Sequence, residues 1–212
     1  MIGETVEANL EYNRRVWGDA ANWIDRDKYG YQWSGGLKQA ASDISRFADA
    51  FLKPYTNGRY DHRVLEVSPG AGRFTAELIR YAARLDLLDM NHACLDICKE
   101  RFKYYPLEID FLHNDGQSCD ILRERSYSLI ASFDSMVHMH PDIIEGYICQ
   151  LAPRLEPNGI MWLDHSGKGA RSVGHRTDMT AGKMKAIGKA CGLILLEQKY
   201  RNDHDCVSVF IQ

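Results

Sequence analysis

The sequence lacks the features that mark several large classes of protein. It contains no run of about 18 consecutive apolar residues, so we expect no membrane span. The segment Met1–Leu10 carries two glutamates where an export signal has an apolar core. Positive charge is not in excess, because 26 lysines and arginines face 29 aspartates and glutamates, a formal net charge of −3. Nucleic-acid-binding domains usually carry a clear basic excess, so we expect no nucleic-acid partner.

Paired cysteines are lacking as well. The six cysteines are scattered without a Cys-x-x-Cys motif, at positions Cys94, Cys98, Cys119, Cys149, Cys191 and Cys206. A closed structural zinc site needs four ligands, and a single pair of nearby cysteines does not supply them, so we predict no metal site. Because no export signal accompanies the cysteines, we expect reduced, mostly buried thiols in a cytoplasmic protein.

Short apolar runs alternate with segments of helical periodicity from Asp61 onward. The predicted strands cover residues 63–67, 85–90, 109–113, 127–133, 159–164, 193–198 and 206–210, and the predicted helices cover 73–83, 93–102, 142–155 and 181–191. Such alternation implies an α/β fold with a mostly parallel sheet covered on both faces. Only the turn Arg201–His204 separates the last two strands, so the last strand should pair antiparallel.

The N-terminal quarter of the chain is unusually aromatic. Three of the four tryptophans, Trp17, Trp23 and Trp33, lie in this part, and a helix is predicted over residues 36–52. We therefore divide the chain into an N-terminal lid and helix, residues 1–56, and a sheet domain, residues 57–212. Large aromatic rings usually pack into a core. Trp33 stands nearest to a pair of glycines, and we expect it to contact the substrate.

A glycine loop follows the first predicted strand. Gly70 and Gly72 allow the backbone to turn tightly and to approach a ligand closely. Thr75 occupies the place of the third glycine of the dinucleotide-binding fingerprint. Glu66 ends the strand, and a carboxylate there would repel a diphosphate but attract an ammonium group. The loop therefore favours a nucleotide that carries an amino acid over NAD.

Two further acids follow the next two strands. Asp89 lies near the offset at which an acid accepts hydrogen bonds from ribose hydroxyls. Asp115, in the turn Asn114-Asp115-Gly116, is suited to accept from an exocyclic amine such as that of adenine, and a simple Asx turn explains the same residues equally well. Three acids at the ends of three successive strands indicate a nucleotide-like ligand.

These motifs together resemble those of the class I S-adenosylmethionine-dependent methyltransferases. The resemblance spans about residues 60–212 and rests on the segments 65–75, 89–91, 114–116 and 132–138. It implies a Rossmann-like, seven-stranded sheet and S-adenosyl-L-methionine as cofactor, with S-adenosyl-L-homocysteine as product. The cofactor-binding residues that it implies are Glu66, Ser68, Gly70, Ala71, Gly72, Asp89, Met90, Asp115, Gly116 and Phe133. The chain departs from the family where Ser68, followed by Pro69, replaces the usual first glycine.

Candidate catalytic groups follow the fourth and fifth strands. His138 is the leading general base, since histidine titrates near neutral pH, and Asp134 is its expected catalytic neighbour. The alternative for His138 is packing under the loop or contact with the cofactor. His165 and Arg176 are expected to bind substrate, because both follow the fifth strand, where substrate would enter. Arg176 also belongs to a basic segment there. A divalent-metal site at Asp134, Asp164 and His165 has too few ligands to be predicted.

The resulting functional prediction is methyl transfer to oxygen. The expected acceptor is a small molecule or glycan of polar, sugar-like character, and the basic segment is suited to negative charge on it. Two alternatives remain open: an NAD(P)-dependent oxidoreductase with a similar sheet, and a non-catalytic protein that keeps the cofactor site for regulation.

Overall fold

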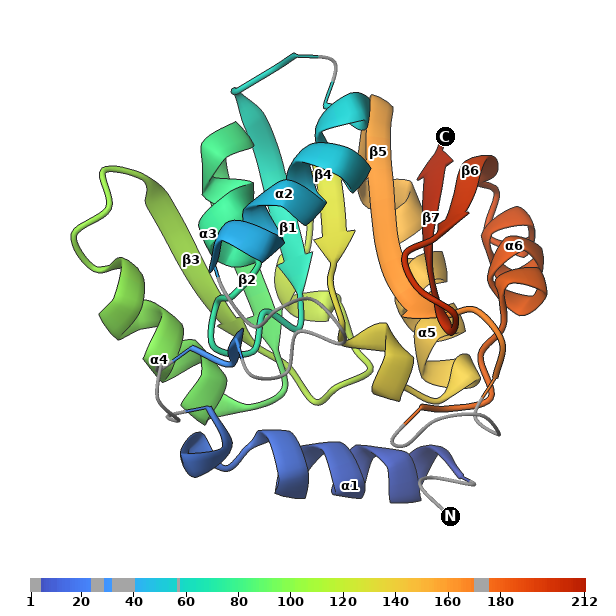
Figure 1. Ribbon diagram of the computed structural model, residues 1–212, viewed down its shortest axis with the longest axis horizontal. Coiled ribbons are helices and arrows are strands. Elements are labelled where there is room, and N and C mark those ends of the chain that lie inside the picture. The colour runs from blue at the N-terminus through green and yellow to red at the C-terminus, as the bar shows by residue number, and fades with distance from the viewer. Residues whose placement is uncertain (1–4, 24–28, 32–40, 57, 170–175) are drawn as a thin grey trace.

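The computed structural model describes residues 5–23, 29–31, 41–56, 58–169 and 176–212, and a seven-stranded sheet forms its centre (Figure 1). The strands are β1 (His62–Val67), β2 (Ala82–Asp89), β3 (Glu108–His113), β4 (Tyr127–Ser132), β5 (Leu155–Ser166), β6 (Ile194–Tyr200) and β7 (Asp205–Ile211). Their order is β3-β2-β1-β4-β5-β7-β6. Pairing is parallel from β3 to β5, and β7 runs antiparallel to β5 and β6. The predicted sheet, with its antiparallel last strand, is confirmed.

Helices cover both faces of the sheet, and side-chain alternation along the strands explains how. Along β1, Leu65 and Val67 join the core cluster that holds α5 (Pro141–Leu151) and α6 (Ala181–Ala190). Val64 joins the cluster on the other face, with α2 (Ala41–Phe51), α3 (Thr75–Leu78) and α4 (His92–Phe102). Successive strand residues point to opposite faces, so one apolar strand serves two cores. Helix α2 thus shares a core with the sheet, while the division of the chain at residue 56 stays a prediction.

Helix α1 (Val6–Trp17) lies apart from these two layers, across the edge of the sheet where β1, β4 and β5 end (Figure 1). Thr5 caps its N-terminus, since its hydroxyl accepts a hydrogen bond from the Ala8 amide at 3.2 Å. Its Leu10 is buried in the same cluster as α5. Ligands of open α/β sheets bind where strands end at their carboxyl side, so α1 covers the edge at which chemistry is expected.

Two element boundaries differ from those expected. The helix predicted over residues 73–83 is only the four-residue α3, followed by a 3-10 turn over Ile79–Tyr81. Strand β2 already begins at Ala82 because this residue pairs with His62 of β1. Strand β5 likewise begins at Leu155, since pairing with β4 continues through an irregular register before the expected start at Gly159. Sheet pairing outweighs local helix and turn preference at both places.

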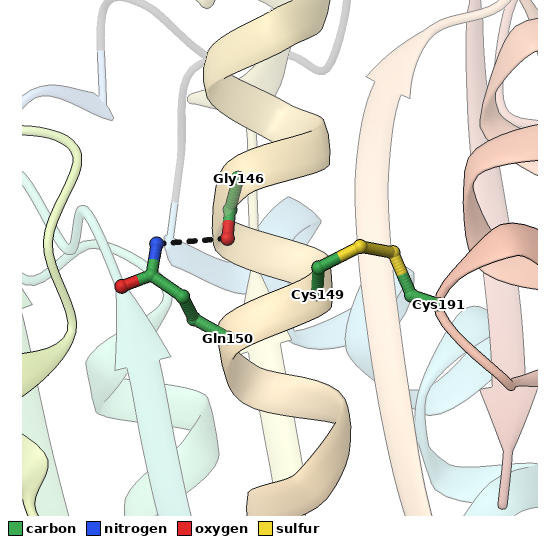
Figure 2. The surroundings of a disulfide bond; sticks show 4 residues. All are labelled: Gly146, Cys149, Gln150 and Cys191. Atoms are coloured by element: carbon green, nitrogen blue, oxygen red, sulfur yellow. Dashed lines mark hydrogen bonds between the residues drawn. A yellow bond between two sulfur atoms is a disulfide. The ribbon is translucent and has the colours of Figure 1, made fainter.

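One pair of cysteines is oxidised, which corrects the expectation of six reduced thiols. Figure 2 shows Cys149 on α5 bonded to Cys191, which directly follows α6, with Cα atoms 4.8 Å apart. The neighbouring Gln150 turns away and donates to the Gly146 carbonyl at 2.9 Å. The two cysteines are 42 residues apart in the chain. Only the packing of α5 beside α6 brings them together, and no local motif announces it. The other four cysteines are free and buried.

Two absences hold for the part of the chain that the structure describes. No helix there is long and apolar enough to cross a membrane. No three histidine, cysteine or acidic side chains there gather in a way that would hold a metal ion.

Candidate functional site

The site begins where β1 and β4 end side by side. Ser68 follows β1 with a φ of 57°, and Asp134 follows β4 with a φ of 53°, both in the left-handed region that non-glycine residues rarely adopt. The hydroxyl of Ser135 donates to the Ser68 carbonyl at 2.8 Å and so ties the two loops together. Strained backbone of this kind concentrates at functional sites. Ser68 replaces a glycine of the family pattern at a position where glycine would be unstrained.

The glycine loop makes close contacts that only glycine allows. Gly70 has a φ of 56°, and a Cβ atom there would lie 2.7 Å from the ring of Trp23. At Gly72, with a φ of 76°, a Cβ atom would lie 2.6 Å from the ring of Phe102. Ala71 between them is fully buried, and its carbonyl accepts from the Arg101 guanidinium at 2.9 Å. The loop is therefore fixed between the N-terminal segment and α4.

Glu66 lies beneath this loop and is buried. The hydroxyl of Thr75 donates to its carboxyl group at 2.5 Å. Burial raises the pKa of Glu66 to about 8, against the opposing effects of the Thr75 hydrogen bond and the Arg101 charge. Thr75, which occupies the place of the third glycine in a dinucleotide fingerprint, is thus the partner of the acid.

Asp89, at the end of β2, supports the same loop. Its Oδ2 atom accepts from the Gly70 amide at 3.3 Å, and its Oδ1 atom accepts from the Asn91 amide at 2.9 Å. Burial raises the pKa of Asp89 to about 7, although both backbone hydrogen bonds act to lower it. The structure therefore places two buried acids, Glu66 and Asp89, next to the glycine loop.

Asp115 and Gly116 form the turn after β3. The Asp115 Oδ1 atom accepts from the Gln117 and Ser118 amides at 2.8 and 2.7 Å, and these bonds lower the pKa of Asp115. This is Asx-turn geometry, one of the two interpretations that the sequence left open. Gly116 has a φ of 92°, and a Cβ atom there would lie 2.9 Å from both Leu10 of α1 and the half-buried Met90. The adenine-binding role of this turn stays a prediction.

The N-terminal segment contributes two aromatic rings to the site. The Trp23 indole donates to the Trp17 carbonyl at 2.7 Å and lies against Gly70. The Trp17 ring lies 4.9 Å from the ring of His138, centroid to centroid. His138 is half-buried in a 3-10 turn over Met136–His138, directly beneath α1. Trp33, expected to contact substrate, lies outside the described residues.

Charged side chains fill the other half of the site, after β4 and β5. We call this group the ion network, and it consists of Arg73, Asp134, Asp164, Arg176, Arg201 and Asp205. Arg73 and Arg201 bind the Asp134 carboxylate at 2.8 and 2.7 Å. Burial acts to raise the pKa of Asp134, but the two guanidiniums outweigh it and hold the pKa below its usual value. Asp134 is thus held as an ionised acid, which favours a structural role over proton transfer.

Arg201 is the centre of the ion network, and its side chain is only 2% exposed. Besides Asp134 it binds Asp164 at 2.9 Å and Asp205 at 3.1 Å. Burial raises the pKa of Asp164 to about 7, in spite of the adjacent Arg201. Arg176 binds Asp205 through two hydrogen bonds of 2.6 and 2.7 Å. Arg176 was expected to bind substrate, but Asp205 already neutralises the charge of its guanidinium within the fold.

Two expected site residues belong to the core. His165 is fully buried, and its ring nitrogens contact the Ser166 carbonyl at 2.8 Å and the Ser208 hydroxyl at 2.7 Å. Burial lowers the pKa of His165 to about 4, so the ring is neutral. The expectation that His165 binds substrate is corrected, because β7 covers it by pairing with β5. Phe133 is also buried, with its ring 4.7 Å from that of Phe74.

The sequence interpretation missed the residues that hold the site together. Arg201 was read only as part of a turn, although its spacing of four residues from Asp205 would have suggested an ion pair. Asn9 of α1 was not singled out, and no short-range signal marks it, since its partners lie about 130 positions away.

Comparison with known proteins agrees with this geometry. Residues 64–159 match the family model described as "Methyltransferase domain". A 63-residue stretch is 32% identical to ribosomal RNA small subunit methyltransferase A of Erythrobacter litoralis (strain HTCC2594), which is 30% of this chain and 22% of that protein. The chain thus shares only about a fifth of the length of this relative.

Solved structures match over nearly the full length at low identity. An S-adenosylmethionine-dependent methyltransferase from Clostridium acetobutylicum ATCC 824 superposes with a TM-score of 0.68 at 13% identity, covering 94% of this chain and 98% of that one. Magnesium protoporphyrin IX methyltransferase from Synechocystis PCC 6803, solved with bound cofactor, gives 0.66 at 14%, covering 96% and 97%. Residues 64–159 are therefore similar to a methyltransferase domain, and the chain has the fold of the class I S-adenosylmethionine-dependent methyltransferases.

Proposed function

We propose that the protein is an S-adenosylmethionine-dependent methyltransferase that acts on an oxygen atom of a small polar or sugar-type acceptor. The observation that carries the proposal is the pair of buried acids, Glu66 and Asp89, beside the glycine loop. Burying carboxyl groups is costly unless a partner compensates. A ligand with positive charge supplies that compensation, whereas a diphosphate would add repulsion.

The residues present fit this cofactor. Gly70 and Gly116 both have positive φ, and both lie under side chains of the N-terminal segment, Trp23 and Leu10. Glu66 and Asp89 would hold the amino-acid and ribose portions, and the turn at Gly116 would lie at the adenine. When bound, the cofactor supplies an electrophilic methyl group.

The chain's own task in the reaction is to orient the acceptor and to take its proton. His138 lies at the end of β4 beside the ion network, and its charge would interact favourably with Asp134. An imidazole in this place accepts the hydroxyl proton as the oxygen gains the methyl group, and then returns the proton to water. Trp17, whose ring is tilted by 37° against the same imidazole at 4.9 Å, would shield part of it from water.

The acceptor class follows from the charges around the site. Arg176 is paired with Asp205, and Lys183 is paired with Asp178 at 2.7 Å. Fold contacts thus cancel part of the positive charge that the sequence concentrates after β5. This balance favours an uncharged or weakly anionic small molecule or glycan over nucleic acid. Because a stretch of the chain is similar to a ribosomal RNA methyltransferase, RNA is the competing acceptor that the assay has to include.

Calorimetric titration with S-adenosylmethionine, S-adenosylhomocysteine and NAD tests the cofactor. We expect binding of the first two only, and binding of NAD alone would establish the oxidoreductase alternative. Transfer of a labelled methyl group to sugars, small phenols and RNA then tests the acceptor. Cofactor binding without transfer to any acceptor would favour the non-catalytic alternative. We also propose a cytoplasmic location, which fractionation of cells followed by detection of the protein in each fraction would test.

A further inference from the structure

Helix α1 touches two loops of the site through two rows of side chains. The first row, Asn9, Asn13 and Trp17, recurs every four residues and so lies along one face of the helix. All three side chains contact the loop around His138. The second row, Leu10 and Arg14, lies beside the turn after β3. A single helix therefore links the acceptor side of the site to the turn expected at the adenine.

Asn9 makes the closest connection on the acceptor side. It is fully buried, its Nδ2 atom donates to the His138 carbonyl at 2.9 Å, and its Oδ1 atom accepts from the His140 amide at 2.9 Å. The side-chain amide thus holds the backbone on both sides of Met139, as a neighbouring strand would. Asn13 adds a second donor to the His138 carbonyl at 3.2 Å and also donates to Asn9 at 3.1 Å.

The opposite side of this loop is held by Thr177. Its amide donates to the Val137 carbonyl at 3.0 Å, and its hydroxyl donates to the Met139 carbonyl at 2.6 Å. The loop that carries His138 is therefore fixed between two supports, one from α1 and one from the segment before α6. Removing the α1 support leaves the loop attached to the fold but free to shift on the side that faces the site.

The other row reaches the turn after β3. The Arg14 guanidinium donates to the Asp115 carbonyl at 2.8 Å, and Leu10 lies where a Cβ atom on Gly116 would be, at 2.9 Å. A displacement of this turn therefore acts on α1 and, through its other face, on His138.

We propose that α1 positions His138 for its part in the reaction, with Asn9 as the positioning residue. The inference rests on the proposed function, since it assigns the geometry of the proposed base to an element outside the sheet. It requires that loss of the Asn9 bonds slow the chemical step while cofactor binding persists. A purely structural role for Asn9 would instead lower stability and leave the reaction rate of the folded protein unchanged.

The experiment compares Asn9→Ala, Asn13→Ala and Glu11→Gln. Glu11 is exposed on the same helix and serves as the matched control. For Asn9→Ala we expect kcat to fall about 10- to 100-fold, because small displacements of a catalytic group cost that much, with the acceptor KM and the cofactor dissociation constant within about twofold. Asn13→Ala should show a smaller fall, and Glu11→Gln should match the unaltered protein.

An NMR signal of the His138 ring supplies a readout that does not depend on turnover. We expect its chemical shift to move in Asn9→Ala and to stay in Glu11→Gln. An unchanged ring signal and an unchanged kcat would overturn the proposal, and so would a loss of cofactor affinity equal to the loss of kcat. If Asn9→Ala does not fold, Asn9→Asp carries the test, since a carboxylate still accepts from the His140 amide but cannot donate to the His138 carbonyl. If the unaltered protein transfers no methyl group, the proposed function fails, while the ring signal still reports on positioning.

Discussion

Replacement of Arg201 by methionine should destabilise the protein severely, because a buried cation with three acidic partners is lost. The guanidinium binds Asp134, Asp164 and Asp205 at 2.7, 2.9 and 3.1 Å, and the three carboxylates are at most 6% exposed. Methionine preserves most of the apolar length of the side chain, so the change removes charge and hydrogen bonds with little loss of volume.

The magnitude depends on which carboxylates keep another cation. Asp134 retains Arg73, and Asp205 retains Arg176, whereas the buried Asp164 loses its bound guanidinium. Removing one partner of a buried pair typically costs about 3–5 kcal/mol, and we expect a value near 3 because the pKa of Asp164, already raised to about 7, allows that acid to take up a proton. Adding Asp164→Asn should recover part of the loss.

Urea unfolding at pH 7 measures the effect, with Arg59→Met as the control. Arg59 binds Asp61 at the surface, where both side chains are about half exposed or more, and such pairs are worth about 0–1 kcal/mol. A loss below about 1 kcal/mol for Arg201→Met, or one equal to that of Arg59→Met, would refute the reasoning.

The dependence of stability on acid pH gives a second check. The pKa of Asp134 is lowered in the fold, so its contribution to stability is present above its unfolded pKa and disappears as the pH falls through the folded value. Arg201→Met should flatten that acid dependence.

Three further outcomes follow from the geometry. Gly70→Ala should lower the free energy of unfolding by about 1–2 kcal/mol more than Gly58→Ala does. Both glycines have positive φ, but only a Cβ atom at Gly70 would meet a ring, that of Trp23. Equal losses in the two variants would exclude this contact. Cofactor binding should release protons near pH 7 and tighten as the pH rises toward 8, because the pKa of Glu66 is raised to about 8 and a cationic ligand favours its ionised form. Calorimetry in two buffers measures this release, and Glu66→Gln should reduce it. Reduction of the Cys149–Cys191 disulfide should lower the free energy of unfolding by about 2–4 kcal/mol, which thermal unfolding measures. The control is the double variant Cys149→Ser, Cys191→Ser, on which the reductant should have no effect.

Local sequence pattern predicted the sheet well, because its strands are short stretches of chain, while the cofactor-binding residues stay a prediction. Apolar periodicity located each strand, and the run from Glu66 to Gly72 announced both the strand end and the loop. His165 was misplaced for a physical reason: it follows an apolar run, but the strand continues to Ser166 and pairs with β7, which leaves the ring inside. The ion network, in contrast, forms only because β5 pairs with β7, and no local motif predicts that pairing.

The bond between Cys149 and Cys191 and the contacts of Asn9 share this property. In both cases the interacting residues are far apart in the chain, by 42 positions for the cysteines and by 129 for Asn9 and the His138 carbonyl. Propensity and periodicity describe a residue's neighbours in sequence, so they predicted the helices α5 and α6 without saying what touches them, and they predicted no helix over α1.

The position of β7 between β5 and β6 has a consequence for the order of assembly during synthesis. The strands that hold Glu66, Asp89 and the glycine loop emerge from the ribosome first, and β1, β2, β3 and β4 pair without help from later residues. Asp164 cannot meet Arg201, and Arg176 cannot meet Asp205, until residues 201–211 have also emerged. The nascent chain thus completes the strands beside the glycine loop while Asp164 and Arg176 still lack their partners in the ion network. A chain interrupted before β7 would leave the edge of β5 open to pairing with other chains.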